Sequence, residues 1–216
     1  MPGTFVTFEG IDGSGKSTQL RLLNNFLRTK GYNPLITREP GGTPVGLRLR
    51  AALLDASEEV DPLTELLVFA ADRAQHVRRV IRPALEAGQI VISDRYADAT
   101  VAYQGAGRGF PPALIQEIVQ LATEGLKPDL TVLFDLGIEE STCRTTRRST
   151  GKSSKVGRDR LDIEDAEFHA RVRDAYLQLA RAEPERVKVI DSSGPVERTQ
   201  EQLKTIIVSF LQSRGH

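Results

Sequence analysis

Short apolar runs rich in β-branched residues alternate along the chain with longer segments in which apolar residues recur every three or four positions. The short runs predict strands, and the longer segments predict amphipathic helices. The expected strands cover residues 4–8, 33–37, 89–94, 130–136 and 186–191. The expected helices cover residues 17–30, 62–87, 112–123, 165–182 and 197–212. This alternation predicts an α/β fold with a parallel sheet covered by helices.

One segment departs from the alternation. Residues 144–160, RTTRRSTGKSSKVGRDR, carry seven basic residues, one acidic residue and several serines and threonines, with almost nothing apolar. Such a composition is not expected to pack into a core, and it predicts a loop. Two interpretations stay open: a solvated charged loop, or a cationic lid that becomes ordered over phosphate groups.

Length and composition narrow the class of protein. A chain of 216 residues is expected to form a single domain over residues 1–216. Basic and acidic residues number 29 each, so the overall charge does not favour nucleic acid or an anionic membrane as a partner. Cys143 is the single cysteine, the N-terminus lacks a signal-peptide pattern, and no apolar run approaches the length of a membrane span. We therefore expect a cytoplasmic protein without a membrane anchor.

The stretch FEGIDGSGKST, residues 8–18, contains the pattern G-x-x-x-x-G-K-[ST] between an expected strand and an expected helix. Its glycines let the backbone turn so that N–H groups point inward, and the helix start adds the positive end of its dipole. The stretch predicts a phosphate-binding loop, with Lys16 on the outer phosphates and Ser17 on Mg²⁺. The candidate nucleotide-binding residues are Gly10, Ile11, Asp12, Gly13, Ser14, Gly15, Lys16, Ser17 and Thr18.

Asp94 directly follows the apolar run at residues 89–93. Because the carboxyl ends of parallel strands meet at one edge of a sheet, this carboxylate is expected near Ser17. It is a candidate second ligand for Mg²⁺. An ordinary N-cap aspartate is the alternative.

A phosphate loop alone does not identify a reaction, because it occurs in switches, motors and transferases. The chain lacks the N-K-x-D segment expected of a guanine switch and the L-S-G-G-Q signature of an ABC-type ATPase. It has instead Arg38, Arg73 and Arg95 at strand ends or on helices expected at the same edge. Guanidinium groups pair bidentately with phosphate oxygens, so the three together favour a phosphorylated acceptor, although any one alone is compatible with a surface ion pair.

Taken together, these segments resemble the thymidylate kinase family of the bacterial type. The resemblance runs through nearly the whole chain in the family's order, in FEGIDGSGKSTQ, REPGGT, LLVFAADRAQH, ISDRYADATVAYQGAGRG, DRLD and FHARVRDAYLQLA. It implies a P-loop kinase fold with a five-stranded parallel sheet in the order 2-3-1-4-5 and a basic lid. It also implies phosphoryl transfer from ATP to dTMP with Mg²⁺ as cofactor, and a homodimer.

The resemblance assigns several residues to the thymine base. Phe69 would stack on the ring, and Arg73 would bond a thymine carbonyl. Thr100 lies where a polar side chain meets the ring N–H, and Gln104 matches a further acceptor-site residue. Stacking supplies affinity, and polar partners reject analogues that leave them unpaired. Phe69 also lies on an apolar helical stripe, so a packing role is the alternative.

Other residues are assigned by the resemblance to the sugar and phosphate. Asp12 would bind the 3′-hydroxyl of dTMP, and Tyr103 would crowd the 2′ position and disfavour ribonucleotides. Arg38 and Arg95 would hold the acceptor phosphate. The sequence leaves open whether dUMP is accepted, because one methyl group discriminates by only about 1–3 kcal/mol.

Members of the family carry a catalytic arginine either in the phosphate loop or in the lid. Position 13 is Gly13, so the resemblance implies a lid arginine, within about residues 139–162. Asp162 stands where glutamate is usual and Ala99 where serine is common, and either difference could alter the lid or the acceptor site. The candidates that stabilise the transferring phosphoryl group are Lys16, Arg95, Arg144, Arg148 and Arg160.

Two other functions stay open from the residues alone. A kinase for another acceptor would share the phosphate loop without needing the set of Phe69, Arg73, Thr100 and Tyr103. A regulator without enzymatic activity would bind ATP and release no ADP with any acceptor. A panel of acceptors distinguishes these functions.

Overall fold

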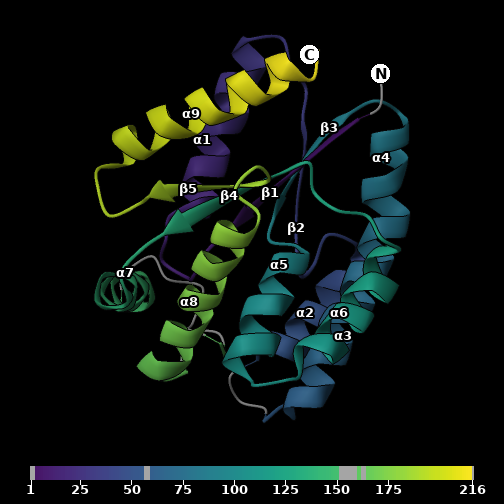
Figure 1. Ribbon diagram of the computed structural model, residues 1–216, viewed down its shortest axis with the longest axis vertical. Helices are drawn as coiled ribbons and strands as arrows, with labels where there is room; N and C mark the ends of the chain where they lie inside the picture. Colours follow the sequence, from purple (N-terminus) through teal and green to yellow (C-terminus); the bar gives the residue numbers. More distant parts are fainter. Residues whose placement is uncertain (1–2, 56–58, 151–159, 162–163, 216) are drawn as a thin grey trace.

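The computed structural model describes residues 3–55, 59–150, 160–161 and 164–215, and for residues 148–150 the backbone alone (Figure 1). Five parallel strands form one sheet in the order β2-β3-β1-β4-β5. The strands are β1 (Thr4–Glu9), β2 (Leu35–Arg38), β3 (Ile90–Asp94), β4 (Leu130–Asp135) and β5 (Val187–Asp191). This confirms the predicted fold class and strand order.

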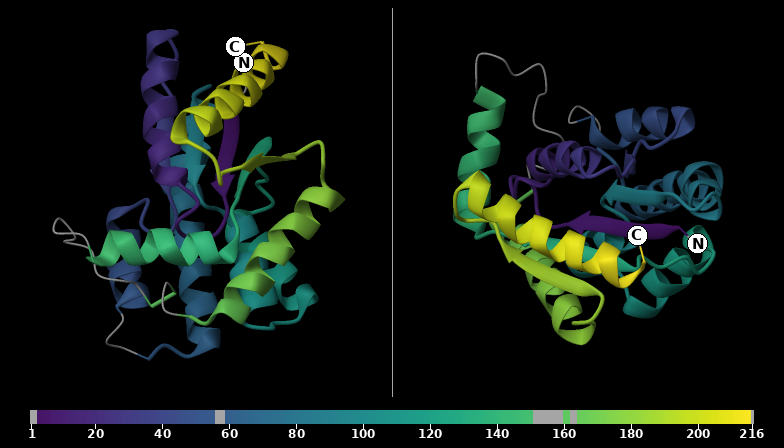
Figure 2. Two further views of the ribbon diagram at one scale, coloured as in Figure 1. Left: turned by 90° about the vertical axis from the view of Figure 1, so that its left-hand side faces the viewer. Right: turned by 90° about the horizontal axis from the view of Figure 1, so that it is seen from above.

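Helices cover both faces of the sheet (Figures 1 and 2). On one face α1 packs beside α9, and the remaining helices lie on the other face or at its ends. The helical segments are α1 (Lys16–Thr29), α2 (Pro44–Leu54), α3 (Pro62–His76), η1 (Val77–Ile81), α4 (Arg82–Glu86), α5 (Ala97–Thr100), η2 (Val101–Gly107), α6 (Pro112–Thr123), α7 (Ile138–Thr150), α8 (Ala166–Ala182) and α9 (Val196–Ser213). Segments η1 and η2 are π-helical.

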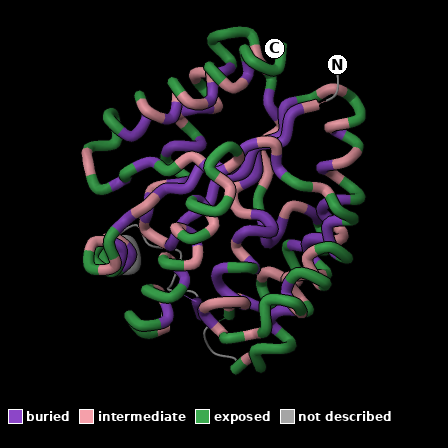
Figure 3. Tube along the Cα trace, viewed as in Figure 1, coloured by how far each residue is buried: buried purple, intermediate pink, exposed green. Residues whose placement is uncertain are grey.

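The core is divided by the sheet. Val6 and Phe8 of β1 pack with Leu23 of α1 and Leu203 of α9, all fully buried. On the other face Leu133 packs with the aromatic residues of α8 and η2. The buried residues therefore follow the strands through the centre of the molecule (Figure 3). Burial of this apolar surface stabilises the fold and keeps the carboxyl ends of the strands in a rigid register.

The structure differs from the predicted elements over residues 62–87, at α2, at α5 with η2, and at α7. The helix expected over 62–87 is three successive segments, α3, η1 and α4, with a π-helical stretch between the two α-helices. Segments α2 and α5 with η2 were not among the predicted helices, and the glycines at residues 41–46 and 105–109 weaken a helical pattern there. Thr43 nevertheless caps α2, its Oγ1 accepting a hydrogen bond from Gly46 N at 2.9 Å.

The prediction of a loop from residue 144 onward is wrong for its first part, because α7 continues to Thr150. Local interactions favour this helix. Arg144 pairs with Glu140 one turn earlier, and the Thr145 hydroxyl donates to Ser141 O at 3.0 Å. Glu139 and Glu140 also lie in the first turn, where negative charge is favourable. No helix in the described part of the chain is long and apolar enough to span a membrane.

Candidate active site

The phosphate loop joins β1 to α1 as predicted. Gly10 has φ 135, and a Cβ at this position would lie 2.5 Å from Phe134 O, so a larger residue is excluded by both strain and space. Lys16 begins α1, and its buried Nζ donates to Gly10 O at 2.8 Å and Ile11 O at 2.9 Å. The ammonium group thus lies inside the loop, among carbonyl groups.

Burial and, to a smaller extent, the charge of Arg95 lower the pKa of Lys16 to about 8, although Asp12 and Asp94 act in the opposite direction. An anion in the loop would offer Lys16 a charged partner in place of carbonyl groups. The loop therefore has the electrostatic character of an anion site, with an ammonium group at the start of a helix.

Ser17 and Asp94 meet at the edge of the sheet, where the Ser17 Oγ donates to Asp94 Oδ2 at 3.1 Å. Both groups are hard oxygen donors of the kind that Mg²⁺ prefers, and Mg²⁺ is commonly bound by one or two protein groups together with substrate phosphates. Within the described residues no cluster of three or more His, Cys, Asp or Glu side chains could hold a metal ion by itself. The pair fits a site that phosphate oxygens would complete.

Arg95 connects the end of β3 to the phosphate loop. Its backbone is left-handed, with φ 71, and its Nη2 donates to Asp12 Oδ1 at 2.9 Å and to Tyr103 Oη at 3.1 Å. Tyr103 Oη donates in turn to Asp12 Oδ2 at 3.2 Å. Burial would raise the pKa of Asp12, but the charges of Arg95 and Lys16 outweigh it and hold that pKa below its usual range. Asp12 is therefore an ionised acceptor at neutral pH.

Glu9 lies beneath this cluster, and the sequence analysis did not identify it. Its carboxyl group accepts hydrogen bonds from Tyr96 N and from Tyr176 Oη, both at 2.7 Å. Burial, with a smaller contribution from Asp98, raises the pKa of Glu9 to about 8. The bond to Tyr96 N holds the residue next to Arg95, so Glu9 supports the left-handed turn that presents the arginine.

Seven of the eight predicted acceptor residues line one cavity between α3, α5, η2 and the phosphate loop. Arg38 lines a neighbouring cavity together with Ser17 and Asp94. Ala99, which replaces a common serine, also lines the first cavity. The seven residues in the first cavity are Asp12, Phe69, Arg73, Arg95, Thr100, Tyr103 and Gln104.

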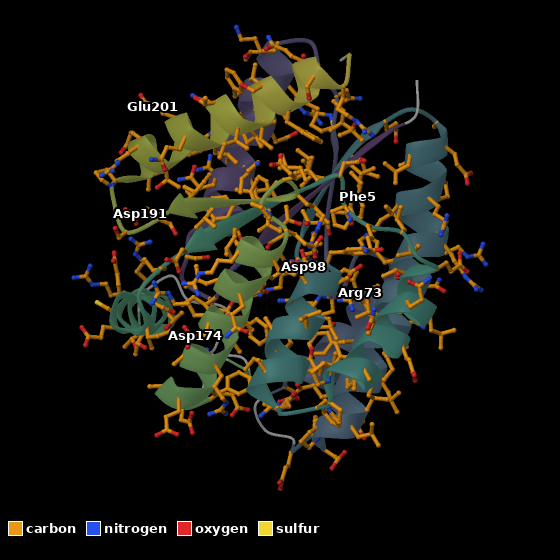
Figure 4. The ribbon with its side chains drawn as sticks, viewed as in Figure 1. Phe5, Arg73, Asp98, Asp174, Asp191 and Glu201 are labelled. Carbon is orange, nitrogen blue, oxygen red and sulfur yellow. The ribbon has the colours of Figure 1, made fainter. Side chains whose placement is uncertain are left out.

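Arg73 is buried, with 2% of its surface exposed, and lies in the middle of the molecule (Figure 4). Its Nε donates to Glu39 Oε2 at 2.8 Å, one terminal nitrogen donates to Thr100 Oγ1 at 2.7 Å, and the other donates to Tyr96 O at 2.8 Å. A guanidinium group has five N–H donors, so one remains on each terminal nitrogen. The structure thus holds Arg73 rigidly and leaves it donors for a ligand.

Glu39 was also missed by the sequence analysis. Its second carboxylate oxygen contacts His76 Nδ1 at 2.9 Å, and His76 Nε2 contacts Thr37 Oγ1 at 2.6 Å. The segment REPGG is thereby attached to α3. In the sequence, only the position of Glu39 in this motif indicated a role for it, because a glutamate beside a proline predicts no buried partner.

The lid arginines lie in different places. Arg144 of α7 lies beside the phosphate loop, where its guanidinium group contacts Gly13 O at 3.4 Å and donates to Ser192 O at 3.0 Å. Arg160 is buried, donates from Nε to Leu53 O at 3.1 Å and pairs with Glu65 of α3. The side chain of Arg148 and the whole of Asp162 fall outside the described residues.

A phosphate loop after the first strand of a parallel sheet, with an arginine-lined cavity at the same edge, defines this chain as a P-loop kinase. Comparison with known proteins identifies which one. The family model described as thymidylate kinase matches residues 8–203, and the chain belongs to the thymidylate kinase family.

Individual relatives agree over nearly the whole chain. The chain is 47% identical to a thymidylate kinase of Desulfovibrio desulfuricans, over 98% of each chain. It is 49% identical to a thymidylate kinase of a Geobacter species, over 99% of this chain and 95% of the relative. The crystal structure of thymidylate kinase from Ehrlichia chaffeensis superposes with a TM-score of 0.76 at 34% identity, covering 96% of this chain and 99% of that one.

Proposed function

We propose that this protein phosphorylates dTMP to dTDP, with ATP as the phosphoryl donor. An oxygen of the dTMP phosphate attacks the γ-phosphorus of ATP, the bond to the bridging oxygen breaks, and ADP leaves. The single observation that carries this proposal is the cavity lined by seven predicted acceptor residues, joined to the phosphate loop through Asp12. Membership of the thymidylate kinase family supports the same substrate pair.

Residues 10–18 would bind the phosphates of ATP, with Lys16 on the outer phosphates. Ser17 and Asp94 would hold Mg²⁺, and the ion would offset negative charge on the phosphate oxygens. The bond between the Ser17 and Asp94 side chains, 3.1 Å long, supports this assignment. The chain need not supply a strong base, because this transfer depends mainly on positioning and on stabilisation of charge.

The acceptor would lie with its base against Phe69 and its edge toward Arg73 and Thr100. Arg73 has free N–H donors for a thymine carbonyl, and the Thr100 oxygen retains a lone pair for the ring N–H. Tyr103 and Asp12 would contact the sugar, while Arg95, which bonds both, would reach the acceptor phosphate together with Arg38.

The positive charge that stabilises the transferring phosphoryl group would come from Lys16, Arg95 and the lid. Among the lid arginines with described side chains, Arg144 is supported best, because it contacts the phosphate loop. The paired and buried state of Arg160 supports an anchoring role for that residue instead. Residues 1–216 would act as one domain, with a lid at about 139–162.

The family resemblance also supports a homodimer and a cytoplasmic location. Light scattering of the purified protein tests the first, which predicts twice the 23.8 kDa mass of the chain. Fluorescence microscopy of a tagged copy tests the second.

The experiment that tests the reaction is ADP release with ATP and Mg²⁺ over a panel of acceptors. The panel contains dTMP, dUMP, UMP, dCMP, AMP, GMP, thymidine and a sample with no acceptor. We expect strong turnover with dTMP and little with UMP. If only another acceptor gave turnover, the protein would still be a kinase, but the assignment of residues to the thymine base would be wrong. ATP binding without ADP release throughout would indicate a regulator.

A further inference from the structure

Glu65 is a fully buried carboxylate in α3, and none of its side-chain surface is exposed. It lies one helical turn before Phe69 and two turns before Arg73, so the three share one face of the helix. Glu65 itself does not line the acceptor cavity. A buried charge of this kind is costly unless partners compensate for it, so its partners indicate its role.

Three side chains surround the Glu65 carboxylate with N–H donors. Gln104 Nε2 donates to Oε1 at 2.8 Å. Arg108 donates to both oxygens, at 3.2 and 2.9 Å, and Arg160 Nη2 donates to Oε2. A carboxylate accepts about four hydrogen bonds, so Glu65 has no capacity left for a ligand. Its role is to hold other residues.

The charges of this cluster also balance. Arg108 pairs with Glu164 at 2.6 Å as well as with Glu65, so two guanidinium groups face two carboxylates. Burial would raise the pKa of Glu65, but the bonds from Arg108, Gln104 and Arg160 outweigh it and lower that pKa. Neutralising Glu65 would leave an excess positive charge in a buried place.

The partners of Glu65 belong to two segments that reach the acceptor cavity, η2 with its following residue Arg108 and the Arg160–Leu161 segment. Gln104 of η2 lines the cavity, and its bond to Glu65 fixes the direction of its amide group. Arg160 precedes Leu161, which also lines the cavity, and Arg160 N and Nε donate to Leu54 O and Leu53 O at the end of α2. One carboxylate therefore sets the position of two cavity walls.

We propose that Glu65 is a positioning residue for the acceptor nucleotide, acting through Gln104 and through the Arg160–Leu161 segment. The proposal rests on the proposed function, because the cavity is taken to hold dTMP. Substitution of Glu65 should weaken the binding of dTMP while leaving the phosphate loop and ATP binding intact. If Glu65 served only the stability of the whole protein, its substitution would not weaken dTMP binding more than ATP binding.

The test is steady-state kinetics of Glu65→Gln with each substrate varied in turn. Glutamine keeps the size of the side chain, but its NH₂ group cannot accept from Arg108 or Arg160. We expect the KM for dTMP to rise by about tenfold, with the KM for ATP within about twofold of the original value. Glu117→Gln, an exposed glutamate on α6, is the matched control and should change neither constant.

Arg160→Lys provides a second test that retains the charge and does not depend on the folding of Glu65→Gln. Lysine cannot reproduce the fork of the guanidinium group, so the KM for dTMP should again rise more than the KM for ATP. An unchanged KM for dTMP, or equal changes in both constants, would overturn the proposal. The proposed function is tested separately, because it would be overturned if the unsubstituted protein were inactive with dTMP. The KM of each variant relative to that of the unsubstituted protein tests only the role of Glu65.

Discussion

The guanidinium group of Arg95 lies 2.9 Å from the carboxylate of Asp12, although 83 residues separate them in the chain. The bond joins the end of β3 to the phosphate loop after β1, and these strands are neighbours in the sheet. One ion pair thereby connects the proposed donor site to the proposed acceptor site. An acceptor bound at this place would have its phosphate beside the positive groups that face the donor.

Replacement of Lys16 by alanine should lower kcat by about a hundredfold or more, because one preorganised charge donor is lost. Lys16 is the buried ammonium group of the loop, whereas Lys30 is exposed at the end of α1. Lys30→Ala is therefore the control. Initial rates of ADP release at saturating substrates measure the effect, and near-full turnover of Lys16→Ala would exclude the assigned role.

Tyr103 permits a test of sugar recognition that separates its ring from its hydroxyl group. Tyr103→Phe removes the bonds to Arg95 and Asp12, so the KM for dTMP should rise several-fold. The ring remains, and discrimination against UMP relative to dUMP should persist. Tyr103→Ala should reduce that discrimination, because the space beside the 2′ position opens. Equal discrimination in both variants would contradict the proposed steric role.

The two lid arginines with described side-chain partners should affect different kinetic constants, Arg144 mainly kcat and Arg160 mainly the KM for dTMP. Arg144→Ala should lower kcat by about ten- to a hundredfold with little change in the KM for dTMP, because its guanidinium lies beside the phosphate loop. Arg147 lies on the same helix, is exposed, and Arg147→Ala serves as the control. If Arg144→Ala raised the KM for dTMP and left kcat unchanged, this arginine would belong to the acceptor site instead.

Glu9 predicts a pH dependence of stability. Its pKa is about 8 in the folded protein against 4.5 for an unperturbed glutamate, so between these values the folded state binds a proton that the unfolded state does not. The contribution of Glu9 therefore favours folding fully below pH 4.5 and is lost as pH rises through about 8. Each pH unit in that window changes it by up to about 1.4 kcal/mol.

Glu9→Gln should remove this dependence, because the amide is neutral at every pH and can still bond Tyr96 N and Tyr176 Oη. Urea unfolding of both proteins at pH 5 and pH 7.5 measures the effect. The variant should gain stability relative to the parent as pH rises. A constant difference between the two proteins would mean that Glu9 titrates near its ordinary pKa.

Local patterns were sufficient for the strands, the main helices and the phosphate loop. The loop depends on residues adjacent in sequence, so its spacing alone specifies the turn, the helix start and the place of Lys16. The resemblance of several motifs then indicated which residues reach the acceptor cavity, and seven of those eight line it. Segments α2 and α7 were missed because glycine and charge are poor signals of helix when capping and i,i+4 pairs decide the outcome.

The supporting carboxylates, in contrast, depend on contacts between distant segments. Glu65 meets Arg160 across 95 residues and Glu9 meets Tyr176 across 167, and no periodicity marks either glutamate as buried. Arg160 illustrates the same limit, because its basic surroundings in the sequence gave no sign of the carboxylate partner that packing against α2 and α3 brings to it. The spacing of residues along the chain thus specified the phosphate loop, because its residues are consecutive in the sequence. Only the packing of the sheet and helices decided which buried charges meet, because that depends on distances that the order of residues does not contain.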